Sequence, residues 1–196
     1  MATRASHILV VVGAFVAGLL IFLGVILYAT GQFGGPAGSA IGGPFKLTGD
    51  NGQPVTNETL RGKPYLVFFG YTHCPDVCPT TLFEMSQMMK ALGKDADRTA
   101  GLFITVDPER DTPAVMKDYL SNFDPHLIGA TGDPKTIEKV EKEFRVIARK
   151  VPTENGDYSM DHSAVIYLMD KQGRFVAPFD LKRKPAEAAA ALRKYF

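Results

Sequence analysis

The chain has 196 residues, 45% of them hydrophobic, which is enough for one membrane anchor and one globular domain with its own core. Lysine and arginine number 22 and aspartate and glutamate 21, so the net charge is +1. This balance leaves no basic stripe and argues against a nucleic-acid-binding protein. The partners must therefore be inferred from local features.

The amino-terminal segment predicts a transmembrane helix. Residues 8–28 contain no charged side chain, and 21 helical residues match a hydrocarbon core of about 30 Å. A cleaved signal peptide has an apolar core of only about 7 to 15 residues, so we favour a retained single-span anchor over residues 1–29. Arg4 precedes the span and no lysine or arginine follows it until Lys46. The positive-inside bias then predicts a cytoplasmic amino terminus, with the rest of the chain in the periplasm or the equivalent intermembrane space.

Residues 30–44 form a glycine-rich linker between the anchor and the globular part. A flexible coil of this length spans about 20 Å on average. The domain predicted over residues 45–196 can therefore move over the membrane surface but cannot leave it, and its substrate should lie close to the bilayer.

The globular part predicts strands and helices in an order typical of α/β proteins. A strand at 65–70, a helix at 79–92 and a strand at 102–106 form a unit whose two strands should be parallel. The remaining predicted elements are a hairpin at 45–47 and 53–55, a helix at 113–122 capped by Thr112, a strand at 127–130, a helix at 134–144, a strand at 146–150, a hairpin at 164–170 and 174–179, and a helix at 185–195. We therefore expect a thioredoxin-like fold, with a central mixed sheet flanked by helices and an extra amino-terminal β-hairpin.

Both cysteines of the chain, Cys74 and Cys78, lie in the turn between the predicted strand 65–70 and the following helix. Open α/β sheets place their chemistry at this carboxyl end of a strand. Because a residue before proline avoids the right-handed helical region, Pro79 is predicted as the first helical residue and Cys78 as the cap. The unpaired N–H groups of a helix start should then favour the thiolate form of Cys78.

A structural disulfide is the alternative, because cysteine pairs outside the cytoplasm are usually bridged. A bridge closing about five residues would contribute roughly 2 kcal/mol, against about 4.7 kcal/mol for a loop near 100 residues. A domain of this size has little need of so local a bond, so we favour a functional pair.

His162 is the candidate third donor, because it lies just before the predicted strand 164–170, whose start should face the cysteine turn. Two thiolates and one imidazole are a soft, low-coordinate set that suits Cu(I) and still accepts Cu(II) or zinc. The alternative is a histidine that only hydrogen-bonds at the start of a strand.

Three stretches of the sequence together resemble the signature stretches of the Sco/SenC family of membrane-anchored copper proteins. They are residues 70–79, residues 106–113 (Val-Asp-Pro-Glu-Arg-Asp-Thr-Pro) and residues 161–163 (Asp-His-Ser). The resemblance covers about residues 45–196. It implies a thioredoxin-like fold, copper held by Cys74, Cys78 and His162, and a role in maturing the binuclear copper site of cytochrome c oxidase subunit II.

Two aspartates are candidates to support these ligands. Asp107 follows the strand expected beside the cysteine-bearing one, so its carboxylate could reach the metal or orient a ligand, or it could simply form the turn before Pro108. Asp161 could orient His162, although neighbours in an extended segment point in opposite directions.

Other potential ligands are weaker. His73 has no motif support, and Met85, Met88 and Met89 fit a helix face in the core better than a copper site. Met160 is a remote thioether candidate, and no role is assigned to His7 or His126.

Three functions remain open from the sequence. The leading hypothesis is a copper metallochaperone that delivers copper to subunit II by ligand exchange. Its further partners would be another periplasmic copper donor, which supplies the copper, or a thiol reductant, which keeps the cysteines reduced. Alternatives are a thiol-disulfide reductase that uses Cys74 and Cys78 to keep the acceptor cysteines reduced, and a copper or redox sensor. A peroxide-reducing enzyme ranks lower, because only Thr72 and Arg110 match its needs.

Overall fold

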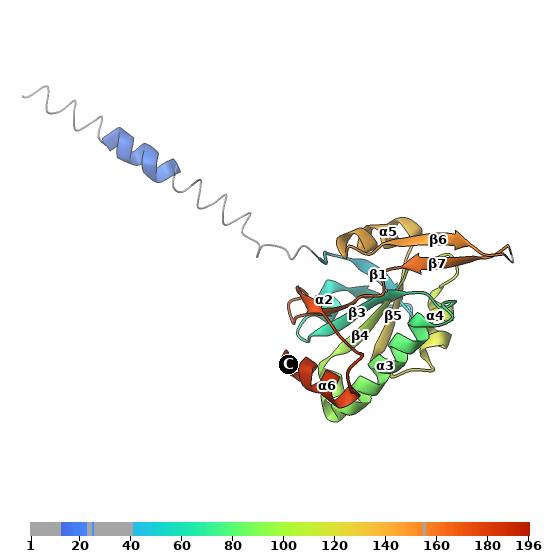
Figure 1. The fold of residues 1–196 in the computed structure, drawn as a ribbon. Coiled ribbons are helices and arrows are strands. Elements are labelled where there is room, and N and C mark those ends of the chain that lie inside the picture. The colour runs from blue at the N-terminus through green and yellow to red at the C-terminus, as the bar shows by residue number, and fades with distance from the viewer. Residues whose placement is uncertain (1–12, 23–24, 26–40, 155) are drawn as a thin grey trace, which may run out of the picture. The chain divides into compact units, whose positions relative to one another are not determined.

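The computed structural model describes residues 13–22, 25, 41–154 and 156–196 of the chain (Figure 1). The chain divides into two compact units, Met1–Gly38 and Ser39–Phe196. In the first unit, residues 13–22 and 25 are helical, whereas the rest of the predicted anchor, Arg4, His7 and linker residues 30–40 lie outside the described residues. No helix within the described ranges combines the length and hydropathy that a membrane span requires.

The second unit is built on a seven-stranded mixed sheet with the strand order β2-β1-β5-β4-β3-β8-β9. The central strands β3, β4 and β5 are parallel, whereas β8 and β9 on one side and β1 and β2 on the other are antiparallel to their neighbours. The strands are β1 (Lys46–Gly49), β2 (Pro54–Thr56), β3 (Tyr65–Gly70), β4 (Ala100–Thr105), β5 (Leu127–Thr131), β8 (Ile166–Met169) and β9 (Phe175–Pro178). The thioredoxin-like mixed sheet and its amino-terminal hairpin are therefore confirmed.

Helices cover both faces of this sheet (Figure 1). In Figure 1, α5 lies above the sheet, and α3 and α6 lie below it. All six residues of β3 are buried, which explains why this strand reads as an uninterrupted apolar run. The helical segments are α2 (Asn57–Leu60), α3 (Val77–Leu92), η1 (Gly93–Arg98), α4 (Pro113–Leu120), α5 (Pro134–Glu143) and α6 (Pro185–Arg193).

The side chains of α3 that face the sheet are core residues. Met85, Met88 and Met89 are buried beside Leu82, as their helical spacing predicted. Thr112 caps α4 as predicted, because its hydroxyl accepts a hydrogen bond from the backbone N–H of Val115.

One strand was missed in the sequence analysis. The strand expected at 146–150 is β6 (Ala148–Pro152), and it pairs with β7 (Tyr158–His162), which the sequence did not predict. These two strands form an antiparallel ribbon outside the seven-stranded sheet, and we call them the β6–β7 ribbon. Their side chains are mostly exposed or half-buried, so the apolar pattern that marks a core strand is missing.

Candidate metal centre

The two cysteines lie where β3 passes into α3. Cys74 is half-buried in the turn, Cys78 is buried in the first turn of the helix, and both are free thiols. The backbone N–H of Cys78 donates a hydrogen bond to Cys74 Sγ at 3.4 Å. Gly70, at the end of β3, packs directly against Cys78. A Cβ atom added to Gly70 would lie only 2.7 Å from Cys78 Sγ. The last residue of the strand must therefore lack a side chain for the thiol to fit.

The predicted position of Cys78 at the helix cap is wrong, because α3 begins at Val77 and Asp76 occupies the cap position. The prediction that Cys78 is a thiolate is also wrong for the metal-free protein. Burial raises the pKa of the Cys78 thiol, the neighbouring Cys74 and Asp111 raise it further, and a hydrogen bond with the backbone of Tyr71 offsets this only in part. Desolvation thus outweighs the helix start, and the thiol stays protonated at neutral pH.

His162 reaches the cysteines from the end of β7. Its Nε2 lies 3.5 Å from Cys78 Sγ, and its Nδ1 lies 3.2 Å from the carbonyl oxygen of Ser163. Because a carbonyl oxygen can only accept, we assign the ring proton to Nδ1, which leaves the lone pair of Nε2 facing the thiols. The rings of Tyr71 and Phe68 pack edge-on against the imidazole, with centroids 5.8 Å and 6.4 Å away.

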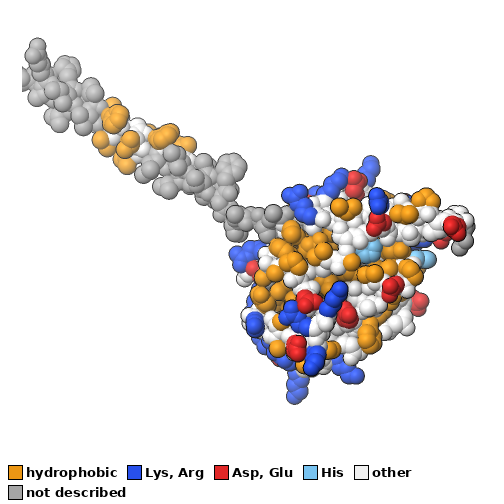
Figure 2. Space-filling view, in the orientation of Figure 1, with side chains coloured by type: hydrophobic (Ala, Val, Ile, Leu, Met, Phe, Trp, Pro, Cys, Tyr) orange, Lys and Arg blue, Asp and Glu red, His pale blue; other side chains and the backbone are white. Residues whose placement is uncertain are grey.

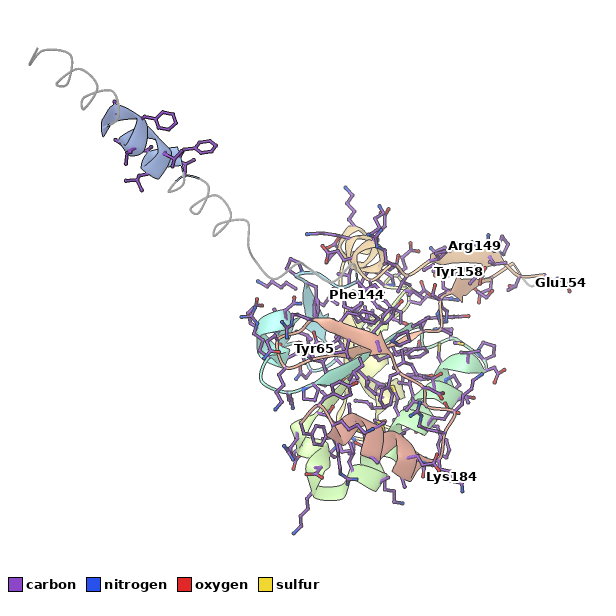
Figure 3. All side chains as sticks on the ribbon, turned by 60° about the vertical axis from the view of Figure 1, so that its left-hand side comes forward. Tyr65, Phe144, Arg149, Glu154, Tyr158 and Lys184 are labelled. Atoms are coloured by element: carbon purple, nitrogen blue, oxygen red, sulfur yellow. The ribbon has the colours of Figure 1, made fainter. Side chains whose placement is uncertain are left out.

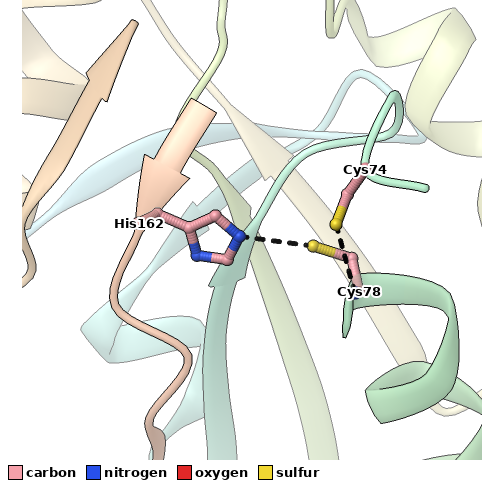
Figure 4. A group of neighbouring side chains, drawn as sticks. All are labelled: Cys74, Cys78 and His162. Carbon is pink, nitrogen blue, oxygen red and sulfur yellow. Dashed lines mark hydrogen bonds between the residues drawn. The ribbon is translucent and has the colours of Figure 1, made fainter. Parts of the chain in front are cut away.

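The three side chains therefore converge from two separate elements (Figure 4). One donor atom from each of Cys74, Cys78 and His162 lies within 4.8 Å of the other two. Metal bonds of about 2.3 Å to sulfur and about 2.0 Å to nitrogen would place the donors of a three-coordinate site about 4 Å apart. The metal-free arrangement is thus close to what a single ion needs, and it is the only such cluster among the described residues.

The structure does not bring the two predicted supporting aspartates to the donor atoms. The carboxylate of Asp107 accepts a hydrogen bond from the Tyr158 hydroxyl at 2.9 Å, and its other oxygen pairs with Arg110 Nε. Asp161 points away from His162 and pairs with Arg149 at 2.7 Å across the β6–β7 ribbon. This is the alternation that an extended strand imposes on neighbouring residues.

Asp111, which the sequence analysis did not single out, supports the cysteine turn instead. Its buried carboxylate accepts three hydrogen bonds, from the Thr72 backbone N–H at 3.0 Å, the Thr72 hydroxyl at 2.6 Å and the Thr105 hydroxyl at 2.6 Å. It thereby ties the start of the turn to the end of β4. The sequence signal for this role was the second aspartate in the stretch 106–113, since that stretch follows the strand beside β3.

The other candidates have different partners. His73 is exposed and contacts the Thr72 hydroxyl through Nδ1, and His126 lies between Asp124 and Asp97. Met160 packs against the core. The Thr72 hydroxyl donates to Asp111, and Arg110 pairs with Asp107.

Comparisons with known proteins agree with this fold and this cluster. A sequence profile described as SCO1/SenC matches residues 34–196. The SCO2-like protein RP587 of Rickettsia prowazekii is 43% identical over 143 residues, which cover 72% of this chain and 70% of that protein. Protein SCO2, mitochondrial, of Saccharomyces cerevisiae is 45% identical over 141 residues, or 70% of this chain and 46% of that protein.

Solved structures resemble the same part of the chain. The structure of Bradyrhizobium japonicum ScoI with copper bound is 65% identical, has a TM-score of 0.78, and is matched over 80% of this chain and 99% of its own. Arabidopsis thaliana ScoI with copper bound is 38% identical with a TM-score of 0.73, over 79% of this chain and 97% of its own. With its cysteine turn, its converging histidine and this extent of similarity, the chain belongs to the SCO1/SenC family.

Proposed function

We propose that this chain is a copper metallochaperone that holds one copper ion through Cys74, Cys78 and His162 and delivers it to the binuclear copper site of cytochrome c oxidase subunit II. The observation that carries the proposal is the convergence of two sulfur atoms and one imidazole nitrogen within 4.8 Å. Two relatives of known structure, ScoI of B. japonicum and of A. thaliana, contain bound copper. The acceptor follows from the family resemblance.

The donor set favours Cu(I) as the cargo. Soft thiolates with one imidazole suit a low-coordinate Cu(I) ion, and Cu(II) remains compatible with the nitrogen donor. Both thiols must ionise to bind the metal, so copper uptake releases protons. Since burial raises the pKa of Cys78, the metal has to displace the proton of that thiol, and loading should weaken as the pH falls.

The surface around the donors suits contact with a protein acceptor. Three exposed aliphatic residues lie near the ligands: Val77, 45% exposed, precedes Cys78, and Val165, 38% exposed, follows His162 by three residues. The third, Ile147, is 72% exposed, and its carbonyl accepts a hydrogen bond from the backbone N–H of Ser163. Figure 2 shows hydrophobic side chains gathered on the visible face of the folded unit, with lysine and arginine mainly towards its margins. Because Cys74 is half-buried rather than enclosed, an acceptor thiol can approach it and replace the ligands one at a time.

We further propose that residues 1–29 anchor the chain and that residues 30–44 tether the copper-binding domain, residues 45–196, on the periplasmic or intermembrane-space side. The uncharged run of residues 8–28 supports this. Carbonate extraction of membranes should leave the chain in the pellet, and protease added to spheroplasts should digest residues 45–196. Release by carbonate would contradict the anchor.

The test of the copper site uses the reduced full-length chain, purified in detergent because residues 8–28 are apolar. Titration with Cu(I) against a chromophoric chelator should give one tightly bound copper per chain. His162→Ala should weaken binding by more than about a hundredfold, since even residues that only orient a ligand are worth about 10- to 100-fold.

The matched control is His73→Ala, which removes an exposed histidine next to Cys74 and should leave the affinity unchanged. Equal copper affinity in the parent and in His162→Ala would contradict the proposed site.

A thiol-disulfide reductase is the second candidate, because both cysteines are free and lie next to each other. In that reaction the half-buried Cys74, as a thiolate, attacks an acceptor disulfide and Cys78 resolves the mixed disulfide. The acceptor leaves with two thiols, and Cys74 and Cys78 are left as a disulfide. If His162→Ala keeps full copper binding but loses reduction of an acceptor disulfide peptide, the reductase is the better description.

A further inference from the structure

The β6–β7 ribbon carries His162 but is not part of the sheet that carries the cysteines. Its two strands pair with each other from Ala148 and His162 at one end to Pro152 and Tyr158 at the other. The described strands of the ribbon form no ladder with the seven-stranded sheet. Backbone pairing with that sheet therefore does not hold His162 in place, and its position depends on the contacts of the ribbon and on the short connection from His162 to β8.

Tyr158 makes two polar contacts between the ribbon and the rest of the unit, besides the ion pair of Lys150 with Glu109 at 2.6 Å. Its hydroxyl donates to Asp107 Oδ1 at 2.9 Å, and its backbone carbonyl accepts from Arg110 Nη1 at 3.0 Å. The guanidinium of Arg110 lies over the Tyr158 ring at 3.8 Å, and the Lys150 ammonium lies 4.5 Å from the ring centroid. Figure 3 labels Tyr158 beside Arg149 on the ribbon, with Glu154 at the far end of it.

The partner of Tyr158 is itself firmly held. Asp107 is buried, its carboxylate pairs with Arg110, and its backbone N–H donates to the Thr105 hydroxyl at 2.9 Å. Hydrogen bonds to a buried, ionised carboxylate are stronger than those between neutral groups. The Tyr158 hydroxyl is thus fixed to the end of β4, which is the strand beside the cysteine-bearing β3.

Tyr158 and His162 lie on one face of the same strand. Residues at i, i+2 and i+4 of a strand share a face, and Met160 between them packs against the core. Four residues of antiparallel strand span about 13 Å. A short, paired strand transmits a fixed end over this distance, so the anchor at Tyr158 contributes to the position of the His162 imidazole, together with the ring contacts of Tyr71 and Phe68.

We propose that Tyr158, held by Asp107, is a positioning residue that places His162 Nε2 over the two thiols. The inference rests on the proposed copper site and adds the residues that preorganise its nitrogen donor. It also gives Asp107 a role at a distance: the carboxylate touches neither the thiols nor the imidazole, but it fixes the strand that carries the imidazole.

The test is Tyr158→Phe in the full-length chain, which removes the hydroxyl and keeps the ring beside Arg110 and Lys150. Cu(I) affinity, measured by competition with a chromophoric chelator, should fall about tenfold, as for other residues that orient metal ligands. In a His162→Ala background the same substitution should change the affinity by less than about twofold, because the donor that it positions is absent. An equal loss in both backgrounds would overturn the proposal.

The matched control is Asp161→Asn, which breaks the exposed pair with Arg149 on the other face of the same strand and should leave the affinity unchanged. A loss equal to that of Tyr158→Phe would mean that any change in the ribbon weakens binding, and would overturn the role of Tyr158.

A readout without metal separates this inference from the copper proposal. In the metal-free chain, nuclear Overhauser contacts between the Tyr71 and His162 rings should be present in the parent and weakened in Tyr158→Phe. If the parent fails to bind Cu(I), the proposed function fails while the ring contacts still decide the positioning role. Unchanged ring contacts in Tyr158→Phe would overturn that role.

Discussion

Asp111 and Asp107 lie four residues apart on the loop between β4 and α4, and each supports one half of the metal centre. Asp111 holds the cysteine turn through three hydrogen bonds from Thr72 and Thr105. Asp107 holds the β6–β7 ribbon, and so His162, through Tyr158 and Arg110. One loop thus holds both the cysteine turn and the separate pair of strands that carries the imidazole.

The two halves differ in how deeply they are embedded. The cysteine turn continues directly from a buried strand, and the donors that Asp111 satisfies are buried or half-buried. The β6–β7 ribbon lies outside the sheet, and the side chain of Arg110 is 18% exposed. Water can therefore replace some of the hydrogen bonds that the Asp107 carboxylate accepts. We therefore expect the thiol half to determine stability and the histidine half to determine how tightly the third ligand is held.

The largest effect is expected from Asp111→Ala. The substitution leaves the buried Thr105 hydroxyl and the Thr72 N–H without an acceptor, which should lower the free energy of unfolding by about 3 to 4 kcal/mol. Urea unfolding of the metal-free chain measures it. Asp118→Ala, an exposed aspartate on α4, is the control and should change little. A decrease in the free energy of unfolding as small as that of the control would contradict this expectation, because it would mean that water accepts the hydrogen bonds of these donors in the variant.

A smaller effect on the same half is expected from Gly70→Ala. The added methyl would lie 2.7 Å from Cys78 Sγ and 2.7 Å from Phe103 Cε2, and both neighbours are packed in the core. Overpacking of this kind should cost about 2 kcal/mol and should displace the buried thiol.

Urea unfolding and Cu(I) competition measure the two consequences of Gly70→Ala. The control is Gly132→Ala, whose new methyl first meets the side-chain end of Leu47 at 3.2 Å. Parental copper affinity in Gly70→Ala would show that the position of Cys78 tolerates this shift.

The smallest loss of stability is expected from Asp107→Ala, which makes the same side-chain change as Asp111→Ala on the other half of the centre. Its donors, Tyr158 and Arg110, are partly accessible to water, so the free energy of unfolding should fall by only about 1 to 2 kcal/mol. Its copper affinity should nevertheless fall, because the ribbon loses its anchor. A loss of stability equal to that of Asp111→Ala would remove the distinction between the halves.

The local sequence was informative wherever burial or capping has a short-range signature. The apolar run of residues 65–70 is β3 as predicted, and Thr112 before Pro113 starts α4 as predicted. The same logic failed for β7, because Tyr-Ser-Met-Asp-His has no apolar alternation and is held by pairing with β6 and by Tyr158. It also failed for Cys78, since the sequence indicates a nearby helix start but not how deeply the thiol is buried.

The sequence by itself determined the fold class and the strand-to-helix turn that presents both cysteines, because those depend on residue type and local pattern. It also predicted that Cys74, Cys78 and His162 belong together, through the resemblance of three short stretches to one family. Only the tertiary structure decided which aspartate supports which half, that the Cys78 thiol is protonated, and that His162 depends on a ribbon outside the sheet. These features depend on contacts between residues far apart in the sequence, such as Thr72 with Asp111, 39 positions apart, and Cys78 with His162, 84 positions apart. The free energy of such contacts depends on how deeply the groups are buried and on the distance between them. The residues next to each group in the sequence do not determine either quantity.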